Sequence, residues 1–330
     1  MITLIHPSYA TAFLRTLAGA KAGSTQQDDS GFSPFAYRIE NGAAIIPLQG
    51  VLISDFAVGW GFTSYEILRA QLMRAANDPK VARVVLAINS PGGEVAGLDG
   101  AAATIENLMG QKPVTAHVQG VAASAAYWLA SQCHEIVVSQ LSEVGSIGCV
   151  FIHVDHSQFF ESAGFKVSLI ASGRHKLDAN AYEALSSGAR ADIQARVDSL
   201  RDDFAREVGA GRGERFSYAD ALATEAKIFS APEAVKSGLA DRLGTLDDVL
   251  GEEGKAGARL AMAHRRAAKS GNPKMAAAGL EPWSNVIARM NGQAAPRPPQ
   301  QEAAGRHDNN GKPWGQVISG LRERKISENP

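Results

Sequence analysis

Between residues 43 and 138, short β-branched apolar runs alternate with segments whose apolar residues recur at helical spacing. The run VARVVLAINS (81–90) has the composition of a buried strand, and the glycine-rich turn PGG follows it. The segment at 64–78 before it carries apolar residues three and four positions apart, as on one face of a helix. Strand, helix, strand and helix in this order predict βαβ crossovers, and hence an α/β fold with a parallel sheet covered by helices.

The same reading predicts the elements on either side of this unit. Residues 43–53 are expected to form a strand pair or one bent strand. The remaining expectations are helices at 97–109 and 122–133, strands at 113–120, 135–140 and 167–172, and a long helix at 187–209. The segment 149–156 also alternates like a strand. In the long helix the apolar residues Ile193, Val197, Leu200, Phe204 and Val208 share one stripe, and Gly209 stands where a helix would end.

The alternating pattern stops near residue 250, which divides the chain into three parts. Residues 1–38 are interpreted as an N-terminal extension, 39–250 as the folded domain, and 251–330 as a low-complexity tail. The tail is rich in Ala, Gly, Pro, Gln and charge, so it is expected to be disordered, because it cannot bury enough apolar surface to offset chain entropy.

Within the tail, the pattern Pro-Trp-x-x-Val-Ile occurs twice, at Trp283 and Trp314, 31 residues apart. Trp, Val and Ile at these spacings fall on one face of a helical turn. Chance or a weak capping helix explains the repeat in one interpretation. In the other, it is a duplicated docking motif that folds onto a partner.

The overall composition narrows the class of protein. A net charge of −1 does not favour nucleic acid as a partner. Two cysteines provide no disulfide framework and favour a reducing compartment. No apolar run reaches the roughly 18 residues that span a bilayer, and no signal peptide is recognised. We therefore expect a cytoplasmic protein without its own membrane anchor, and nothing in the sequence indicates a metal or a cofactor.

Candidate chemistry begins with a lone hydroxyl in the small, apolar stretch GVAASAAYWLA (120–130). Ser124 lies at the expected start of a helix, where free N–H groups and the helix dipole favour developing negative charge. A serine acts as a nucleophile only if a base takes its proton and donors stabilise the oxyanion that follows. The Pro91-Gly92-Gly93 turn could aim such N–H donors, although a lone Gly-Gly is more often a simple tight turn.

Two residue types could supply the base. Four histidines, His117, His134, His153 and His156, lie within about 35 residues of Ser124 in the sequence. Lys176, in ASGRHKLDANAY, is the other candidate. A neutral lysine near pH 7 needs a pKa roughly 3 units below its reference value. From local sequence alone, a surface loop lysine is the simpler reading.

Five segments in order, INSPGG, GVAASAAY, VGSIG, SGRHKLDANAYEALS and FSAPEAVKSGLADRLGTLDDVL, resemble the signal peptide peptidase A family of serine proteases. The resemblance covers roughly residues 40–250. It implies a crotonase-like or Clp-protease-like spiral of βαβ units and a Ser-Lys dyad, with residues 39–250 as the Ser-Lys protease domain. A Clp-type triad would need a histidine at the position of Cys149, so that variant is not supported.

Carried over residue by residue, the resemblance makes Ser124 the nucleophile and Lys176 the general base. Gly93 and Ala125 would donate the oxyanion-hole N–H groups, and Gly92 would shape the turn. Ser146, in GSIG, matches a hydroxyl that orients the lysine. Family members assemble as rings, so a homo-oligomer is expected, and the lysine acts either within its own chain or on a neighbouring copy.

The segment PLQGVLISDFAVGWGFTSYEIL is similar to the phage branch of the family, whose members include prohead (capsid assembly) proteases fused to a C-terminal scaffold segment. This similarity implies a head-maturation protease that cleaves scaffold and itself in the procapsid of an infected host cell, with self-cleavage between residues 250 and 280. Scaffold, coat or portal protein would be its partners. The alternatives are a host cytoplasmic peptidase, a catalytically silent assembly scaffold, and a crotonase-type acyl-CoA enzyme.

Overall fold

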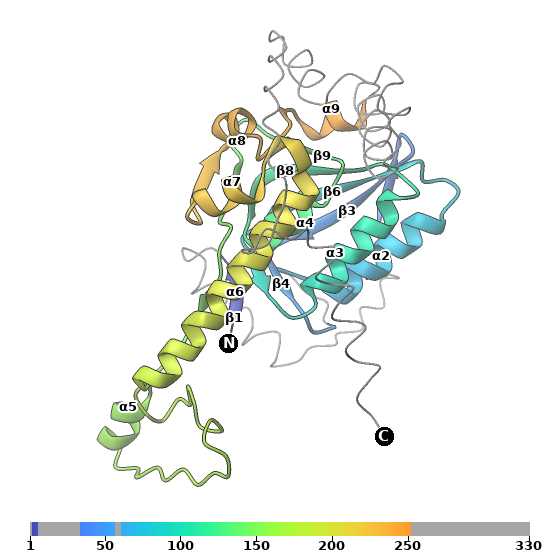
Figure 1. The fold of residues 1–330 in the computed structure, drawn as a ribbon. Coiled ribbons are helices and arrows are strands. Elements are labelled where there is room, and N and C mark those ends of the chain that lie inside the picture. The colour runs from blue at the N-terminus through green and yellow to red at the C-terminus, as the bar shows by residue number, and fades with distance from the viewer. Residues whose placement is uncertain (1, 6–33, 57–60, 252–330) are drawn as a thin grey trace, which may run out of the picture.

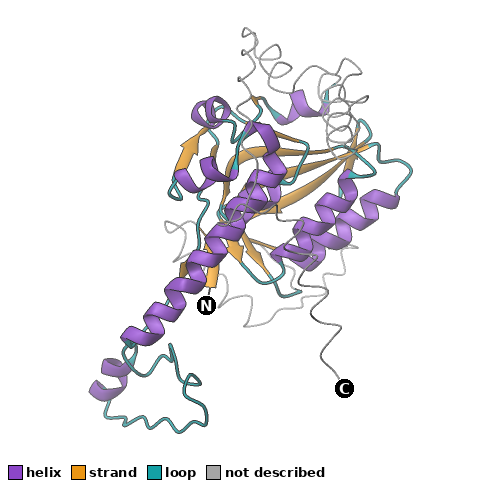
Figure 2. Cartoon of the chain, in the orientation of Figure 1, coloured by secondary structure: helices purple, strands orange, loops and turns teal. Residues whose placement is uncertain are grey.

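The computed structural model describes residues 2–5, 34–56 and 61–251 of the chain. Within these ranges the chain forms two sheets with helices packed against them (Figures 1 and 2). The expected tail after residue 251, with its two Trp motifs, lies outside the described residues, as does most of the expected extension at 1–38.

The larger sheet has eight strands among the described residues. Its main path runs β12-β10-β8-β6-β3-β2, with β9 paired to β8 and β13 to β9. The strands are β2 (Arg38–Glu40), β3 (Ala43–Gln49), β6 (Arg83–Ser90), β8 (Val114–Ala123), β9 (Glu135–Val138), β10 (Glu143–Gly145), β12 (Ile228–Ser230) and β13 (Arg242–Leu243). The central strands β3, β6, β8 and β10 are parallel. The parallel α/β sheet predicted from the apolar runs is therefore confirmed.

The smaller sheet has five strands in the described part of the chain, in the order β11-β1-β7-β4-β5. They are β1 (Ile2–Ile5), β4 (Val51–Ile53), β5 (Phe62–Ser64), β7 (Gly92–Glu94) and β11 (Val150–Phe151). The expected strand pair at 43–53 is β3 and β4, which lie in different sheets. Gly50 makes the turn between them with φ +66°, and a Cβ there would lie 2.1 Å from the carbonyl oxygen of Gly61.

Helices cover the sheets and complete the core. They are α2 (Tyr65–Asn77), α3 (Leu98–Met109), α4 (Ala125–Ser131), α5 (Ser157–Ser162), α6 (Ser187–Arg212), α7 (Tyr218–Ala223), α8 (Ala231–Ser237) and α9 (Leu246–Leu250), with a 3₁₀ turn, η2 (Gly213–Arg215). Helices α2 and α3 lie side by side (Figure 1), and α4 packs against α3, α6, β7 and β8. No helix within the described ranges is both long and apolar enough to cross a bilayer.

Helix α6 extends away from the sheets. The end of α6 that lies far from the sheets is its N-terminal end, and it joins an arm made of α5 and the loops around it (Figure 1). Its apolar stripe is buried at Phe204 and Val208 but only half-buried nearer the arm. Two predictions were wrong here. Residues 167–172 form no strand, and the helix continues past Gly209, whose missing Cβ would lie 2.7 Å from the backbone nitrogen of Tyr218. That glycine serves a close contact between α6 and α7, and it does not end the helix.

The base of α6 is fixed to the sheet by a buried charge cluster. Asp241 accepts hydrogen bonds from the guanidinium groups of Arg212 (2.8 and 2.9 Å) and Arg215 (3.1 Å), and from the backbone N–H of Ile136 (2.6 Å). Burial alone would raise the pKa of the Asp241 carboxyl, but the two arginines and the hydrogen bonds hold that pKa well below its usual range. The half of α6 near the sheets is therefore anchored.

Candidate active site

Three parallel neighbours, β6, β8 and β10, end beside one another, and each is followed by a residue that the sequence singled out. Ser90 of β6 pairs with Ala122 of β8, and Ala123 of β8 pairs with Gly145 of β10. Gly92 and Gly93 therefore follow one strand, Ser124 the next and Ser146 the third. Ligands of open α/β sheets bind at this carboxyl edge.

Ser124 occupies a tight turn between β8 and α4 and has a backbone conformation that is unusual for a side-chain-bearing residue. Its φ and ψ are 54° and −122°, and the residue is fully buried. Its N–H donates to the carbonyl of Gly145 (2.8 Å), and its Oγ donates to the carbonyl of Gly148 (3.4 Å). Such backbone strain costs about 1–3 kcal/mol and clusters at functional sites. The turn thus fixes one hydroxyl at the start of a helix.

The Gly-Gly turn has a steric cause at both positions. Gly92 has φ +100°, a value that favours glycine. Gly93 lies so close to β4 that a Cβ would sit 1.9 Å from the carbonyl oxygen of Leu52. Only a residue without a side chain brings the backbone of β7 to this place. Ala125, the other expected donor, is the buried first residue of α4, and α4 packs against β7.

Ser146 follows β10 directly and is buried, with φ 55°. Its N–H donates to the carbonyl of Lys227 at 2.8 Å. Ala123 and Gly145 are partners in parallel strands, and the N–H of Ser124 donates to the carbonyl of Gly145, so Ser124 and Ser146 follow the ends of adjacent strands. The structure therefore brings together the expected nucleophile and the expected lysine-orienting hydroxyl.

Lys176 is placed elsewhere. It lies in a turn of the exposed loop between α5 and α6, where its N–H donates to the carbonyl of Gly173 (3.2 Å). The side chain is exposed, and the loop belongs to the arm at the far end of α6 (Figure 1). No hydrogen bond within the described part of the chain joins Lys176 to Ser124. A single copy of the chain therefore does not show the two groups in contact.

The other candidate bases have structural partners. His117 lies in the sheet with its Nε2 3.2 Å from the carbonyl of Gly244, and Nδ1 of His134 accepts from the backbone N–H of Val114 (3.1 Å). The Nε2 of His153 lies 2.8 Å from the carbonyl oxygen of Asn180, so this histidine links two segments of the arm.

His156, the last of these histidines, precedes α5 on the exposed arm. At the position where a Clp-type histidine would stand, burial raises the pKa of the Cys149 thiol to about 12. That thiol is therefore protonated at neutral pH and supplies no base.

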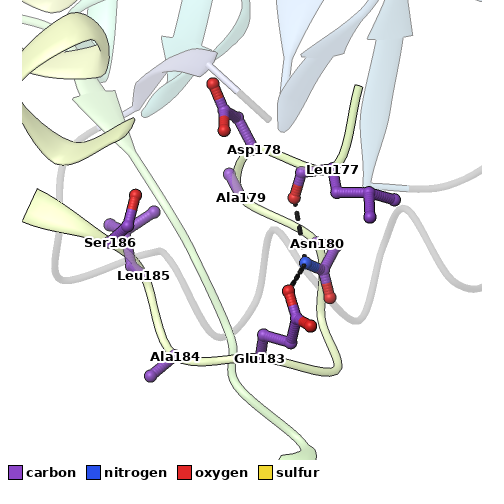
Figure 3. A pocket seen from close by; sticks show the side chains of 8 residues that line it. All are labelled: Leu177, Asp178, Ala179, Asn180, Glu183, Ala184, Leu185 and Ser186. Carbon is purple, nitrogen blue, oxygen red and sulfur yellow. Dashed lines mark hydrogen bonds between the residues drawn. The ribbon is translucent and has the colours of Figure 1, made fainter. Parts of the chain in front are cut away.

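A small pocket lies immediately after Lys176 (Figure 3). It is lined by Leu177, Asp178, Ala179, Asn180, Glu183, Ala184, Leu185 and Ser186. The side-chain amide of Asn180 donates to the carbonyl of Leu177 (2.9 Å) and to the carboxylate of Glu183 (3.0 Å). These contacts shape the turn that carries the lysine. The sequence offered no periodic signal for them.

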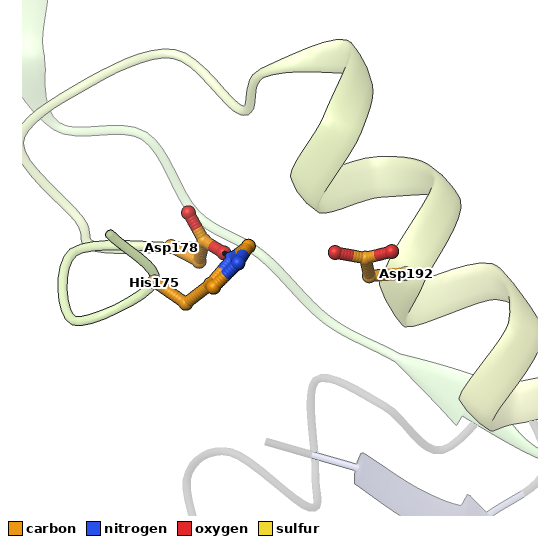
Figure 4. A group of neighbouring side chains, drawn as sticks. All are labelled: His175, Asp178 and Asp192. Atoms are coloured by element: carbon orange, nitrogen blue, oxygen red, sulfur yellow. Dashed lines mark hydrogen bonds and ion pairs between the residues drawn. The ribbon is translucent and has the colours of Figure 1, made fainter. Parts of the chain in front are cut away.

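The same loop approaches the start of α6 through a group of three side chains, His175, Asp178 and Asp192 (Figure 4). Their nearest ligand-type atoms all lie within 4.8 Å of one another, and Nδ1 of His175 is 2.8 Å from a carboxylate oxygen of Asp178. All three residues are exposed, and exposed acidic groups commonly gather without a metal ion. We therefore assign this group no metal.

Comparison with known proteins finds similarity to protease families over parts of the chain. Residues 106–259 match the model of peptidase family S49, and residues 61–136 match the Clp protease model. The chain is 39% identical over 217 residues to the head-tail preconnector protein GP5 of Enterobacteria phage P21, covering 65% of this chain and 43% of that one.

Two further relatives extend the comparison. The chain is 33% identical over 272 residues to the capsid assembly protease C of Escherichia phage lambda, covering 75% of this chain and 62% of the relative. It is 29% identical over 183 residues to a putative signal peptide peptidase SppA of Enterococcus faecium, covering 54% and 52% of the two chains. The chain thus spans roughly half of the curated relatives it matches.

Proposed function

Because residues 106–259 match the model of peptidase family S49, we propose that the chain is a serine endopeptidase in which Ser124 is the nucleophile and Lys176 the general base. One observation carries this proposal. A buried hydroxyl in a strained turn, at the start of α4, lies one strand away from the glycine turn at Gly93 and one strand away from Ser146. This is the arrangement that acyl transfer needs: a fixed nucleophile, backbone donors near it, and a second hydroxyl to position the base.

The proposed reaction follows from these positions. Neutral Lys176 removes the proton of Ser124 while the serine oxygen attacks a peptide carbonyl held in an extended strand. The N–H groups of Gly93 and Ala125 stabilise the oxyanion. The lysine ammonium then gives its proton to the leaving amine. In the second half, the neutral lysine takes a proton from water, the hydroxide attacks the acyl-enzyme, and the ammonium returns the proton to Ser124.

Lys176 acts as a base only where water is excluded, and its loop is exposed in a single chain. We therefore propose a homo-oligomer, in keeping with the rings that the family resemblance implies, in which the arm of one copy brings Lys176 to Ser124 of a neighbour. Support comes from the apolar stripe of α6, which stays half-buried at Ile193, Val197 and Leu200 although it leads directly to this loop. The arm itself exposes Phe159 and other aromatic side chains.

The test uses the full-length chain and a peptide-hydrolysis assay. Ser124→Ala and Lys176→Ala should each lower the rate by at least about 10⁴-fold. Lys166→Ala, which removes another exposed lysine from the same arm, should leave the rate unchanged. Mixing the two inactive variants should restore activity if the lysine acts in trans. Full activity in Lys176→Ala would refute the dyad, and failure of the mixture would assign the lysine to its own chain.

We propose further that the substrate is the scaffold of a phage procapsid, together with this chain itself. Support comes from two phage relatives, which are named a capsid assembly protease and a head-tail preconnector protein. In this proposal residues 39–250 are the protease domain and 251–330 a scaffold-like segment that contacts coat or portal protein in the procapsid. Self-cleavage would fall between residues 250 and 280.

A further inference from the structure

Strand β1 fills the space between two strands of the smaller sheet that border the proposed catalytic residues. It pairs antiparallel with β7 on one side, where Leu4 lies opposite Gly93 and Thr3 opposite Glu94. It pairs antiparallel with β11 on the other side, where Thr3 lies opposite Val150. Strands β7 and β11 do not pair with each other. Within the described structure, only the four residues of β1, Ile2–Ile5, bridge these two strands. Without β1, a slot one strand wide would separate them.

The two walls of this slot lead to the two halves of the proposed site. On the β7 side, the wall is the backbone of Gly93, the proposed oxyanion donor, whose other edge is already paired to Leu52 of β4. On the β11 side, the wall begins two residues after Gly148, whose carbonyl accepts the hydroxyl of Ser124. The backbone at Thr3 and Leu4 therefore lies between the oxyanion turn and the segment that contacts the nucleophile.

An extended chain in this position meets the usual requirements of peptide recognition by strand addition. Main-chain N–H and C=O groups of two facing strands give affinity that does not depend on sequence, and any segment that can extend for four residues fits. A segment of the chain itself can occupy the groove through the same main-chain hydrogen bonds. Because that segment is tethered, a free peptide must be present at millimolar concentration to compete equally with it.

We propose that the slot between β7 and β11 is the groove that receives an extended polypeptide, and that β1 occupies it as a built-in competitor. The inference rests on the proposed peptidase function, because only there does the slot become a substrate groove. A peptide must displace residues 2–5 before its carbonyl can reach Ser124. The groove then opens only when β1 leaves or is exchanged for another strand.

The first test measures binding and needs no catalysis. In full-length Ser124→Ala, a fluorescent peptide with the sequence of residues 1–8 is titrated and followed by anisotropy. Adding Thr3→Pro removes a backbone N–H from β1 and should tighten binding by about tenfold or more, because the competitor no longer pairs. Thr3→Ala keeps that N–H and should bind like the parent. Equal or weaker binding by the proline variant overturns the proposal.

Hydrogen exchange covers the case in which the proline variant does not fold. In Ser124→Ala with the native β1, saturating peptide should speed amide exchange in residues 2–5 while Gly92–Glu94 and Val150–Phe151 stay protected. Unchanged exchange in residues 2–5 under saturation overturns the proposal. The result can be separated from the peptidase assignment. If the chain hydrolyses peptides but exchange in β1 does not speed up, only the inference about β1 is refuted. If exchange in β1 speeds up but the chain hydrolyses no peptide, the proposed function is refuted and the peptide-binding groove stands.

Discussion

Replacing Gly93 with alanine is a sharp test of the proposed oxyanion turn, because the structure gives the size of the perturbation. The added Cβ would lie 1.9 Å from the carbonyl oxygen of Leu52 and 2.6 Å from the backbone nitrogen of the same residue. An ordinary van der Waals contact between the Cβ and that oxygen would need a distance about 1.5 Å longer. Both atoms belong to the backbone of β4, so no flexible side chain can move aside, and β7 itself must shift.

This shift should cost more in catalysis than in stability. Overpacking of this kind destabilises a fold by about 1–3 kcal/mol, which lowers the melting temperature of a domain of this size by roughly 2–12 °C. Loss of one oxyanion donor lowers kcat by about 10²–10³, and a displacement of 1 Å alone can cost about 10²-fold. We therefore expect Gly93→Ala to remain folded at 25 °C with kcat/KM reduced at least about 100-fold.

The assay is peptide hydrolysis by the full chain, with circular dichroism to confirm the fold and thermal unfolding to measure its stability. Gly188→Ala is the matched control. A Cβ at Gly188 would meet no atom within 4 Å, and the residue is exposed near the start of α6, so its activity should equal the parent's. A folded Gly93→Ala enzyme with more than half of the parent's kcat/KM would show that this backbone N–H does not stabilise the oxyanion.

Three further predictions test other parts of the molecule. Ser124→Gly should resist urea better than Ser124→Ala by about 1–2 kcal/mol, because glycine relieves the strain at φ 54°; equal stability would mean that the turn stores none. Asp241→Asn should lower the free energy of unfolding by about 3–5 kcal/mol, since it leaves Arg212 and Arg215 buried against a neutral amide. Because the pKa of Asp241 is lowered on folding, its contribution is complete above the unfolded value of about 3.9 and fades as the pH falls below it. The difference between parent and variant in denaturant titrations should therefore be constant from pH 5 to 8 and should shrink below about pH 4. Trp283→Ala combined with Trp314→Ala should reduce incorporation into proheads without changing peptide hydrolysis; normal incorporation would remove the docking interpretation of the repeat.

The parts of the fold that the sequence predicted are those whose cause is local. Apolar runs such as 81–90 must be buried on both faces, so their parallel pairing follows from their composition. The glycine turn at 92–93 marked the end of β6 for a similar reason, because a tight turn and a close approach of two backbones both demand glycine. Ser124 stood out for its chemistry and its neighbours, and its position at the start of α4 followed from the helical spacing after it.

The features that the sequence did not predict depend on contacts between distant segments. The sequence could not show that Gly209 serves a contact with Tyr218, because a glycine that ends a helix and one that admits a neighbour look alike. Residues 167–172 had the composition of a strand but find no partner strand among the described residues. The four residues of β1 are too short to carry a periodic signal, and their position is set by β7 and β11.

Together, the two proposals imply that an isolated copy of this chain is held inactive twice. The proposed general base, Lys176, lies on an exposed arm in contact with solvent, and the proposed groove is filled by β1. Assembly would remove the first restraint, because a neighbouring copy would shield Lys176 from water. Substrate would remove the second restraint by displacing residues 2–5 from the groove. The restraints are physically independent, because one is the desolvation of a charge and the other is competition between strands. Such a chain could be made in a cell full of extended polypeptides without cleaving them, and would become active only where copies and substrate are concentrated together, as inside a shell.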